Sequence, residues 1–223
     1  MKKYSVKEIF YTLQGEGFWT GTPSIFVRFS GCNYWSGREE DKAASLCPFC
    51  DTDFVGTDGE NGGKLSAGEI AIKAIRAGKR EGYIGKGMPG HCVLTGGEPT
   101  LQLTSEIYGA LHQSRFRVAV ETNGSNHISP LPRQVDWVTL SPKVPGEKVT
   151  LRRCNELKLL YPLPFGGEPE DFLSEWKGGA DHFYLSPIED ENWEGNTQAT
   201  IDYCMRNPRW RLSLQTHKVV GLP

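Results

Sequence analysis

The chain has 223 residues, 26 of them glycine, and carries a formal net charge of −2 at pH 7. This length suits one domain, residues 1–223, but it is short for a complete eight-stranded (β/α) barrel, which typically takes ~250 residues. No basic surface is expected for nucleic acid, no apolar run approaches the ~20 residues that span a bilayer, and the first residues lack a signal-peptide core. We therefore expect a cytoplasmic protein that binds neither nucleic acid nor a membrane.

Short apolar segments alternate with amphipathic ones along the chain. Strands rich in Val, Ile, Phe and Leu are expected over Ser5–Thr12, Ser24–Phe29, His91–Thr95, Arg117–Glu121, Trp137–Leu140, Glu156–Tyr161, His182–Leu185 and Arg209–Leu214. Helices are expected over Ser66–Arg80, Thr104–Ser114, Glu168–Trp176 and Thr197–Arg206. This alternation favours a mostly parallel sheet with helices outside it. The expected fold class is therefore α/β, as a truncated or open (β/α) barrel.

Local signals describe two of these regions more closely. Ser66 and Glu69 form a capping-box pattern at the start of the first helix. Ile70 and Ala74 then recur at a spacing that would place them on one buried stripe of that helix. The segment before the helix, Thr57–Lys64, is rich in Gly, Asp and Asn, and we expect it to be a flexible loop.

Polar motifs follow seven of the predicted strands. In barrel enzymes the carboxyl ends of the strands carry the chemistry, so we expect these motifs to converge on one face. The alternative is that loops hold polar residues in any protein, but that alternative does not predict three thiols and a Gly-Gly-Glu sequence on the same edge. The motifs are Gln14–Glu16, Cys32, Gly96–Glu98, Thr122–Asn123, Ser141–Lys143, Ser186–Pro187 and Gln215–His217.

The six cysteines divide into a group of three and three isolated residues. The group is Cys32, Cys47 and Cys50. Three thiolates can hold three irons of an iron–sulfur cubane and leave the fourth iron open to a small molecule. The alternative is a structural zinc site, which needs a fourth ligand; Asp51 is the nearest candidate. The isolated thiols are expected to be buried and structural, and they are Cys92, Cys154 and Cys204.

Two motifs carry a resemblance to a known superfamily. Cys47-Pro48-Phe49-Cys50 places an aromatic residue before the last cysteine, and Thr95-Gly96-Gly97-Glu98-Pro99 follows a predicted strand. Together they resemble the radical S-adenosylmethionine (SAM) superfamily. Fourteen residues separate Cys32 from Cys47 where most members have three, and this long spacing is similar to that of the 7-carboxy-7-deazaguanine synthases. Further segments that look like this family are Leu13–Gly17, Asn33–Asp41, Asp51–Asp53 and Gln215–Lys218.

The resemblance implies a partial (β/α) barrel of the radical SAM type and a carbon–nitrogen lyase. Its substrate would be 6-carboxy-5,6,7,8-tetrahydropterin and its product 7-carboxy-7-deazaguanine, a step toward queuosine and related deazapurines. A 5′-deoxyadenosyl radical would take a hydrogen atom from C6, the ring would contract, ammonia would leave and SAM would be regenerated. Two alternatives stay open: another radical SAM enzyme, such as a glycyl-radical activase, or a zinc-stabilised binding module without catalysis.

The resemblance also implies cofactors and partners. The cofactors are a [4Fe–4S] cluster on Cys32, Cys47 and Cys50, SAM, and Mg²⁺ on Thr52. Without the resemblance, Asp51-Thr52 would read equally well as a helix cap. An electron donor such as flavodoxin or ferredoxin would reduce the cluster. A truncated barrel leaves an open sheet edge that dimerisation could cover, so we expect a homodimer.

SAM would be bound by residues that follow several strands. Gly96, Gly97 and Glu98 would hold its methionine end, since Glu98 can accept a hydrogen bond from an ammonium group. Glu121 and Asn123 would hydrogen-bond the ribose. Two Ser-Pro segments would flank the nucleoside, although ordinary Ser-Pro turns are an alternative reading. These segments are Ser141, Pro142 and Lys143, and Ser186, Pro187, Ile188 and Glu189.

The pterin would be read by a second group of residues. Gln14 and Glu16 supply an amide and a carboxylate for its pyrimidine edge. Arg28 is a charge inside an apolar strand, and it would be either a bidentate fork for the substrate carboxylate or an edge-strand arginine that snorkels to water. The free carboxylate of Pro223 would close the pocket. The full set is Leu13, Gln14, Gly15, Glu16, Arg28, Thr95, His217 and Pro223.

Overall fold

The computed structural model describes residues 2–80, 90–128 and 135–223, and in these residues nine strands form one sheet in the order β3-β1-β2-β4-β5-β6-β7-β8-β9. The strands are β1 (Tyr4–Leu13), β2 (Pro23–Phe29), β3 (Gly63–Leu65), β4 (Gly90–Gly96), β5 (Phe116–Thr122), β6 (Trp137–Leu140), β7 (Arg153–Tyr161), β8 (Gly179–Pro187) and β9 (Arg211–Leu212). The helices are α1 (Glu39–Lys42), α2 (Ala67–Arg80), α3 (Ser105–Gln113), α4 (Pro169–Trp176), α5 (Trp193–Arg206) and α6 (Thr216–Val219).

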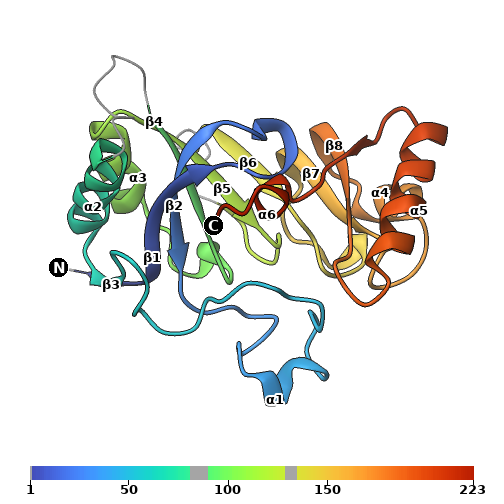
Figure 1. Cartoon of the computed structure of the whole chain (residues 1–223), viewed down its shortest axis with the longest axis horizontal. Helices are drawn as coiled ribbons and strands as arrows, with labels where there is room; N and C mark the ends of the chain where they lie inside the picture. The colour runs from blue at the N-terminus through green and yellow to red at the C-terminus, as the bar shows by residue number, and fades with distance from the viewer. Residues whose placement is uncertain (1, 81–89, 129–134) are drawn as a thin grey trace.

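The sheet is mostly parallel and open. Every neighbouring pair from β2 and β4 through to β8 and β9 is parallel, whereas β1 is antiparallel to both β2 and β3. The edge strands β3 and β9 do not pair with each other, so the barrel does not close. Helices α2 and α3 lie at one end of the sheet and α4 and α5 at the other, while α1 projects away from it (Figure 1). The prediction of a partial α/β barrel is confirmed.

Helix α2 begins where its sequence signal placed it. Ser66 and Glu69 form the predicted capping box: the Ser66 amide donates to Glu69 Oε2 at 2.7 Å, and the Glu69 amide donates to Ser66 Oγ at 3.3 Å. The Glu69 carboxylate also accepts from Lys3, and these hydrogen bonds lower its pKa to about 2. Ile70 and Ala74 are fully buried on the predicted stripe. No helix within the described residues is long and apolar enough to cross a bilayer.

Strand periodicity divides the sheet into a helix-covered face and an inner face. In β4, Cys92 and Leu94 belong to the core under α2 and α3, whereas Val93 between them belongs to a separate small cluster on the inner face. In β7, Leu157 and Leu159 belong to the core that includes residues of α4 and α5. Successive side chains of a strand point to opposite faces. Alternate residues of each strand therefore face the interior of the partial barrel.

The connection between β1 and β2 crosses this interior and closes it at the amino ends of the parallel strands. Phe18 lies 4.8 Å from Trp137 and 4.5 Å from His182, and Trp19 lies 5.3 Å from Trp137 (ring centroids). We call these four residues the aromatic floor. Their contacts combine tilted and edge-on geometries, which are favourable for aromatic rings. The backbone turns tightly here at Gly17, with φ +65°, and a Cβ at this position would lie 2.0 Å from a carboxylate oxygen of Glu156.

The prediction for Gln14–Glu16 is wrong about the edge of the sheet at which this segment leaves its strand. Gln14–Glu16 were expected to lie on the same edge as the other motifs because they too follow a strand. Strand β1 is antiparallel, however, and Leu13 pairs with Pro23 at the start of β2, so the segment leaves β1 at the opposite edge. It reaches the other motifs by crossing the inner face of the sheet.

The segment Thr57–Lys64 is not a free loop. It leads into β3, and it hydrogen-bonds β1 where the β1–β2 register shifts between Val6 and Glu8. Asn61 Nδ2 donates to the Ile9 carbonyl at 2.9 Å, and the Ile9 amide donates to the Glu60 carbonyl at 2.8 Å. The Gly59 amide also donates to the carbonyl of Lys7, the residue at the register shift, at 3.0 Å, and these partners in β1 cannot be read from the loop's own composition. Two short helices, α1 and α6, were not predicted, and α5 begins at Trp193 rather than Thr197.

Candidate active site

A cavity of about 230 Å³ opens at the carboxyl ends of the parallel strands. It lies between these strand ends and the cysteine loop, by which we mean residues 30–56 between β2 and β3. Of the residues predicted from the sequence, it is lined by Glu16, Cys32, Cys47, Cys50, Thr52, Thr95, Gly96, Gly97, Glu121, Asn123, Ser141, Lys143, Ser186, Pro187, Ile188 and Glu189. We call it the first cavity.

All three grouped cysteines line the first cavity. Cys47 and Cys50 are joined by a turn in which the Cys50 amide donates to the Cys47 carbonyl at 3.1 Å, and the Tyr34 amide donates to Cys32 Sγ at 3.4 Å. Burial raises the pKa of the Cys47 thiol to about 12. Thiols ligate metals as thiolates, and metal binding releases their protons. By contrast, Cys92 and Cys154 are buried in the two main cores and Cys204 packs beside the second.

The arrangement of these thiols suits a cluster better than a single ion. Among the described residues, no three His, Cys, Asp or Glu side chains converge closely enough to hold one metal ion. The three cysteines instead line the first cavity together. Asp51, the fourth ligand that zinc would need, binds Lys218 Nζ at 2.6 Å and Gln215 Nε2 at 3.3 Å. Three thiolates that line one cavity suit a multi-iron cluster, whereas a closed tetrahedral zinc site would need a fourth ligand, and Asp51 is already paired with Lys218.

The Gly96-Gly97 segment packs tightly against the start of the cysteine loop. The Gly97 amide donates to the Phe29 carbonyl at 3.2 Å, and the Glu98 amide donates to the Gly31 carbonyl at 2.9 Å. A Cβ at Gly97 would lie 2.3 Å from the Gly31 oxygen. Glycine is therefore needed here for a close approach of two backbones. This contact places β4 directly beside Cys32.

Glu98 does not line the cavity. Its side chain is fully buried and accepts hydrogen bonds from the Thr100 amide at 3.0 Å, from Thr122 Oγ1 at 2.8 Å and from the Asn123 amide at 2.7 Å. Burial raises the pKa of Glu98, and these donors oppose that shift. The carboxylate ties the end of β4 to the end of β5. Pro142 is likewise buried and outside the lining residues.

A second cavity of about 120 Å³ adjoins the first. It contains every residue that the sequence assigned to the pterin, together with Phe10, Thr12 and Phe26. Four residues line both cavities and so form their boundary: Glu16, Thr52, Thr95 and Glu121.

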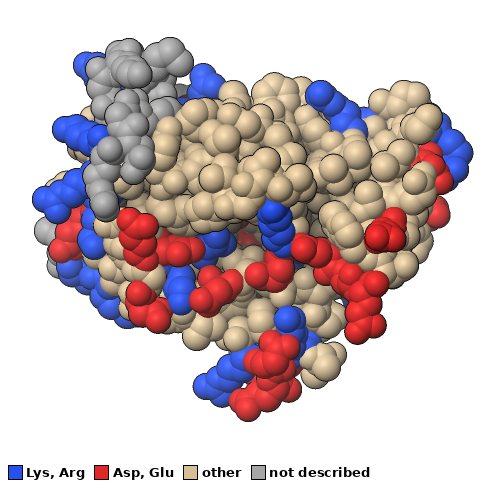
Figure 2. All heavy atoms as spheres, viewed as in Figure 1, with Lys and Arg blue, Asp and Glu red and all other residues tan. Residues whose placement is uncertain are grey.

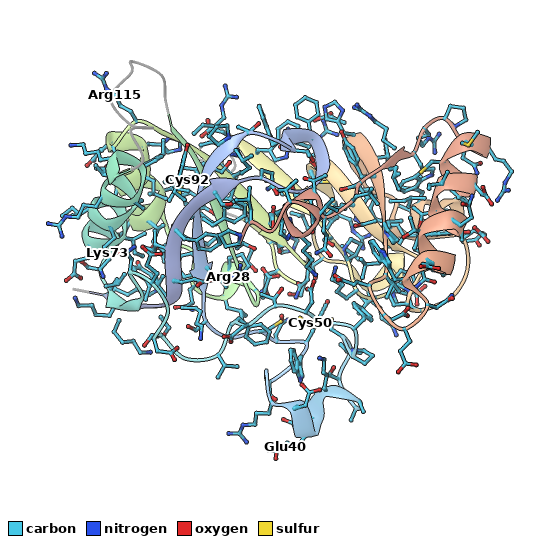
Figure 3. The ribbon with its side chains drawn as sticks, viewed as in Figure 1. Arg28, Glu40, Cys50, Lys73, Cys92 and Arg115 are labelled. Atoms are coloured by element: carbon cyan, nitrogen blue, oxygen red, sulfur yellow. The ribbon has the colours of Figure 1, made fainter. Side chains whose placement is uncertain are left out.

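Arg28 projects into the second cavity from β2 with a fixed orientation. Its Nε donates to Glu8 Oε1 at 2.7 Å, and its guanidinium lies 5.7 Å from the centre of the Phe10 ring. Strand β2 lies inside the sheet, so Arg28 is not an edge-strand arginine. Figure 3 places Arg28 and Cys50 in the central part of the molecule and Cys92 away from them on β4.

The boundary carries a connected set of polar groups. Gln14 Nε2 donates to Glu121 Oε1 at 2.9 Å, and Thr95 Oγ1 donates to Glu121 Oε2 at 3.3 Å. The Glu16 amide donates to Gln14 Oε1 at 3.1 Å. Side chains from β1's connection, β4 and β5 are thereby held in one network. The network offers carboxylate and amide groups to both cavities.

Sequence reasoning missed Lys158, a buried residue that lines the first cavity and not the second. Its ammonium group forms an ion pair with Glu16. Burial is the largest influence on Glu16 and opposes its ionisation, but the charge and hydrogen bond of Lys158, together with a hydrogen bond from Gln215, outweigh burial and hold the pKa of Glu16 below its usual range. The signal was present: Glu156 and Lys158 are charges two residues apart in an otherwise apolar strand. Period-two charge in a buried strand indicates residues that face a polar interior.

The C-terminal segment covers the site. Thr216 donates to the Gly15 carbonyl from both its amide and its hydroxyl, each at 2.9 Å. Lys218 binds Asp51 in the cysteine loop and Glu189 after β8. Acidic and basic side chains accordingly gather along the band between the body of the molecule and the projecting α1 segment (Figure 2).

Comparison with known proteins gives a consistent result, although no family model matches the chain. The 7-carboxy-7-deazaguanine synthase of Caulobacter vibrioides is 48% identical over 220 residues, covering 99% of each protein. That of Burkholderia multivorans is 44% identical over 225 residues, again covering 99% of each. The crystal structure of QueE from Escherichia coli covers 95% of this chain and 93% of its own, with a TM-score of 0.64 and 27% identity. The chain belongs to the 7-carboxy-7-deazaguanine synthase family.

Proposed function

We propose that this protein converts 6-carboxy-5,6,7,8-tetrahydropterin into 7-carboxy-7-deazaguanine and ammonia. Substrate and product differ by one ammonia, so the net reaction needs no oxidant. The observation that carries the proposal is the pair of adjoining cavities: one holds three thiols, and the other holds an amide, a carboxylate and a guanidinium. Family membership supports the same reaction, since the relatives above carry this enzyme name.

Cys32, Cys47 and Cys50 would hold a [4Fe–4S] cluster in the first cavity, with SAM beside it. When bound, these two groups supply a 5′-deoxyadenosyl radical that removes a hydrogen atom from C6 of the substrate. The chain's part is to orient both ligands and keep water out. Asn123 and Ser186, at the ends of β5 and β8, line the same cavity and would orient the nucleoside.

The second cavity would hold the pterin. Gln14 and Glu16 offer hydrogen-bonding groups for its pyrimidine edge, and the guanidinium of Arg28 offers a planar fork for its carboxylate. Thr52 lies on the boundary, where its hydroxyl would share a Mg²⁺ ion with substrate oxygens. C6 of the pterin would then face the first cavity across this boundary.

The decisive experiment is mass spectrometry of one anaerobic reaction that contains the reconstituted protein, a reductant, SAM, Mg²⁺ and the carboxytetrahydropterin. We expect 7-carboxy-7-deazaguanine to form without matching consumption of SAM. If 5′-deoxyadenosine alone appears, the substrate assignment is wrong. If neither product appears from protein shown to hold about four irons, the enzymatic proposal is wrong.

Cys32→Ala separates the cluster site from the structural thiols. It should lose most of its iron and all product formation, since a cluster needs three thiolates to leave one iron open. Cys204→Ala is the matched control and should keep both iron and activity. Full activity in the Cys32 variant would contradict the cluster assignment.

An external electron donor such as flavodoxin or ferredoxin would reduce the cluster, and the protein would act as a homodimer. The support for a dimer is the open sheet, whose edge strands β3 and β9 are unpaired with each other. Sedimentation analysis of the cluster-loaded protein tests the dimer. A monomer at micromolar concentration would contradict it.

A further inference from the structure

Lys158 is a buried cation surrounded by carboxylates. Its side chain is 9% exposed and that of its partner Glu16 is 18% exposed. The charges of Glu16, Glu121 and Glu156 raise the pKa of Lys158 despite a burial effect that alone would lower it. The ammonium group is therefore charged whenever these carboxylates are. A buried carboxylate without such a partner would be expensive and would take up a proton instead.

The geometry limits what Lys158 holds in place. Glu121 is already fixed by Gln14 and Thr95. Glu156 accepts from the Phe18 amide at 3.0 Å and lies outside both cavities. Glu16 is the carboxylate that Lys158 engages directly, and it lies on the cavity boundary.

We propose that Lys158 is a positioning residue for the substrate: it fixes Glu16 as a charged acceptor at the boundary, so that the second cavity selects a heterocycle with adjacent N–H donors. Both oxygens of a held carboxylate can receive two parallel N–H groups, such as the ring N–H and exocyclic amine of a 2-aminopyrimidinone. A ring without those donors would leave the buried carboxylate unpaired, which costs affinity. This inference rests on the proposed function and assigns one determinant of its specificity.

The test compares Lys158→Met, Lys158→Arg and Glu16→Gln/Lys158→Met with wild type. Calorimetry on cluster-loaded protein measures the Kd of the carboxytetrahydropterin, and turnover measures KM for the pterin and for SAM. We expect Lys158→Met to raise the pterin Kd and KM at least tenfold while iron content and the SAM KM stay within twofold of wild type. Lys158→Arg should recover most of the binding, because it restores the cation. Lys79→Met, on the exposed surface of α2, is the matched control.

The double variant distinguishes positioning from simple stability. Removing both charges should return the Tm close to the wild-type value, since no unpaired charge stays buried. Pterin binding should nevertheless stay at least tenfold weaker, because the acceptor is gone. Recovery of both Tm and binding would mean that the pair is only structural and would overturn the inference. If Lys158→Met cannot be purified with its iron, Lys158→Arg and the double variant carry the same test.

A competitive inhibitor tests whether Lys158 contacts the substrate carboxylate directly. Tetrahydropterin lacks the 6-carboxylate, and it is used as a competitive inhibitor. Positioning through Glu16 predicts that Lys158→Met weakens this inhibitor as much as the substrate. An unchanged inhibition constant would show that Lys158 reads the substrate carboxylate itself, which would overturn the inference. Wild-type turnover is checked first: its absence refutes the proposed function, whereas turnover with unchanged Lys158→Met binding refutes only this inference.

Discussion

Arg28 lies on β2, between β1 and β4, where a charged side chain needs partners. Glu8 takes its Nε–H, and the Phe10 ring lies beside the guanidinium. The side chain is thus held in place before any ligand binds. A preorganised guanidinium loses less entropy when it binds a carboxylate than a free one does.

Arg28→Ala should therefore weaken pterin binding by one to two orders of magnitude and leave iron content unchanged. Arg28→Lys should recover little, because it restores the charge without the planar fork. Glu8→Ala should give an intermediate loss, since it removes the support but keeps the fork. The measurements are pterin Kd by anaerobic calorimetry and iron per chain. Loss of iron in Arg28→Ala would show that the residue supports the fold instead.

Gly97 matters because it has no Cβ at a point where two backbones approach closely. In Gly97→Ala, the new Cβ would lie 2.3 Å from the Gly31 oxygen and 2.8 Å from Cys32 Cβ. The cysteine loop would have to move away from β4, so we expect iron content to fall by more than half and SAM binding to weaken. Gly109→Ala in α3 is the control, because nothing lies within 4 Å of its added Cβ. Normal iron content in Gly97→Ala would contradict this account.

The residues most visible in the sequence were those whose chemistry is rare. Three grouped cysteines and a Gly-Gly turn stand out without a structure, and they line one cavity. Lys158 did not stand out in the same way, and Glu98 stood out as a SAM ligand although its side chain is buried away from the cavity. The role of Lys158 depends on β1's connection crossing the barrel, and the burial of Glu98 depends on donors from Thr122 and Asn123. Such tertiary partners cannot be read from one stretch of sequence.

At the scale of elements, β7 combines core and site in one strand. Its apolar residues pack outward, whereas Glu156 and Lys158 face inward. Burial is the main reason that the pKa of Glu156 rises to about 7, and the nearby charge of Lys158 only partly opposes it. Below its ordinary value of 4.5, Glu156 is protonated in both the folded and the unfolded chain. Between 4.5 and about 7 the folded state binds the extra proton, so stability falls as pH rises.

Glu156→Gln should remove this pH dependence. The shift corresponds to a loss of about 3 kcal/mol in the wild-type free energy of unfolding between pH 4.5 and 7. The variant, which cannot ionise, should lose that much less over the same range, and its amide oxygen can still accept from Phe18. Urea unfolding of both proteins at several pH values measures the difference. Parallel stability curves would show that Glu156 does not titrate in this window.

The elements themselves were predicted where local signals are strong. Trp137–Leu140 has the bounds expected from the sequence, and α2 begins at its capping box. The segment Thr57–Lys64 was misread because its Gly and Asn content indicates a loop, whereas Asn61 and Glu60 both bind Ile9 of β1. The direction of β1 was also missed. Strand direction depends on which neighbour a strand pairs with, and periodicity does not encode that.

On the scale of the whole molecule, the C-terminal segment meets the β1–β2 connection over the site. The C-terminal segment binds Gly15 through Thr216 and joins the cysteine loop to β8 through Lys218. Segments from the beginning, middle and end of the sequence therefore have to assemble before either cavity is complete. Exposed ion pairs such as those of Lys218 add little stability, about 0–1 kcal/mol each. Their effect is expected mainly on ligand binding.

Deleting residues 216–223 should separate the stability of the fold from ligand binding. The sheet and the three cysteines remain, so we expect near-wild-type iron content and far-ultraviolet circular dichroism. Pterin binding should be lost, because His217 and Pro223 line the second cavity and Gly15 loses its partner. Lys218→Ala should give a milder, severalfold loss. Pterin binding that survives the deletion would show that the C-terminal segment is not part of the pocket.

The aromatic floor has an optical consequence. Trp19 and Trp137 meet at 5.3 Å with their ring planes 75° apart, close enough for their electronic transitions to couple. Coupled indoles give a pair of circular-dichroism bands of opposite sign, and a Trp19→Phe difference spectrum reports the part of the signal that depends on Trp19. The same connection carries Gln14 and Glu16 into the cavities. This signal therefore reports whether the substrate-binding segment is in its native position, without any added label.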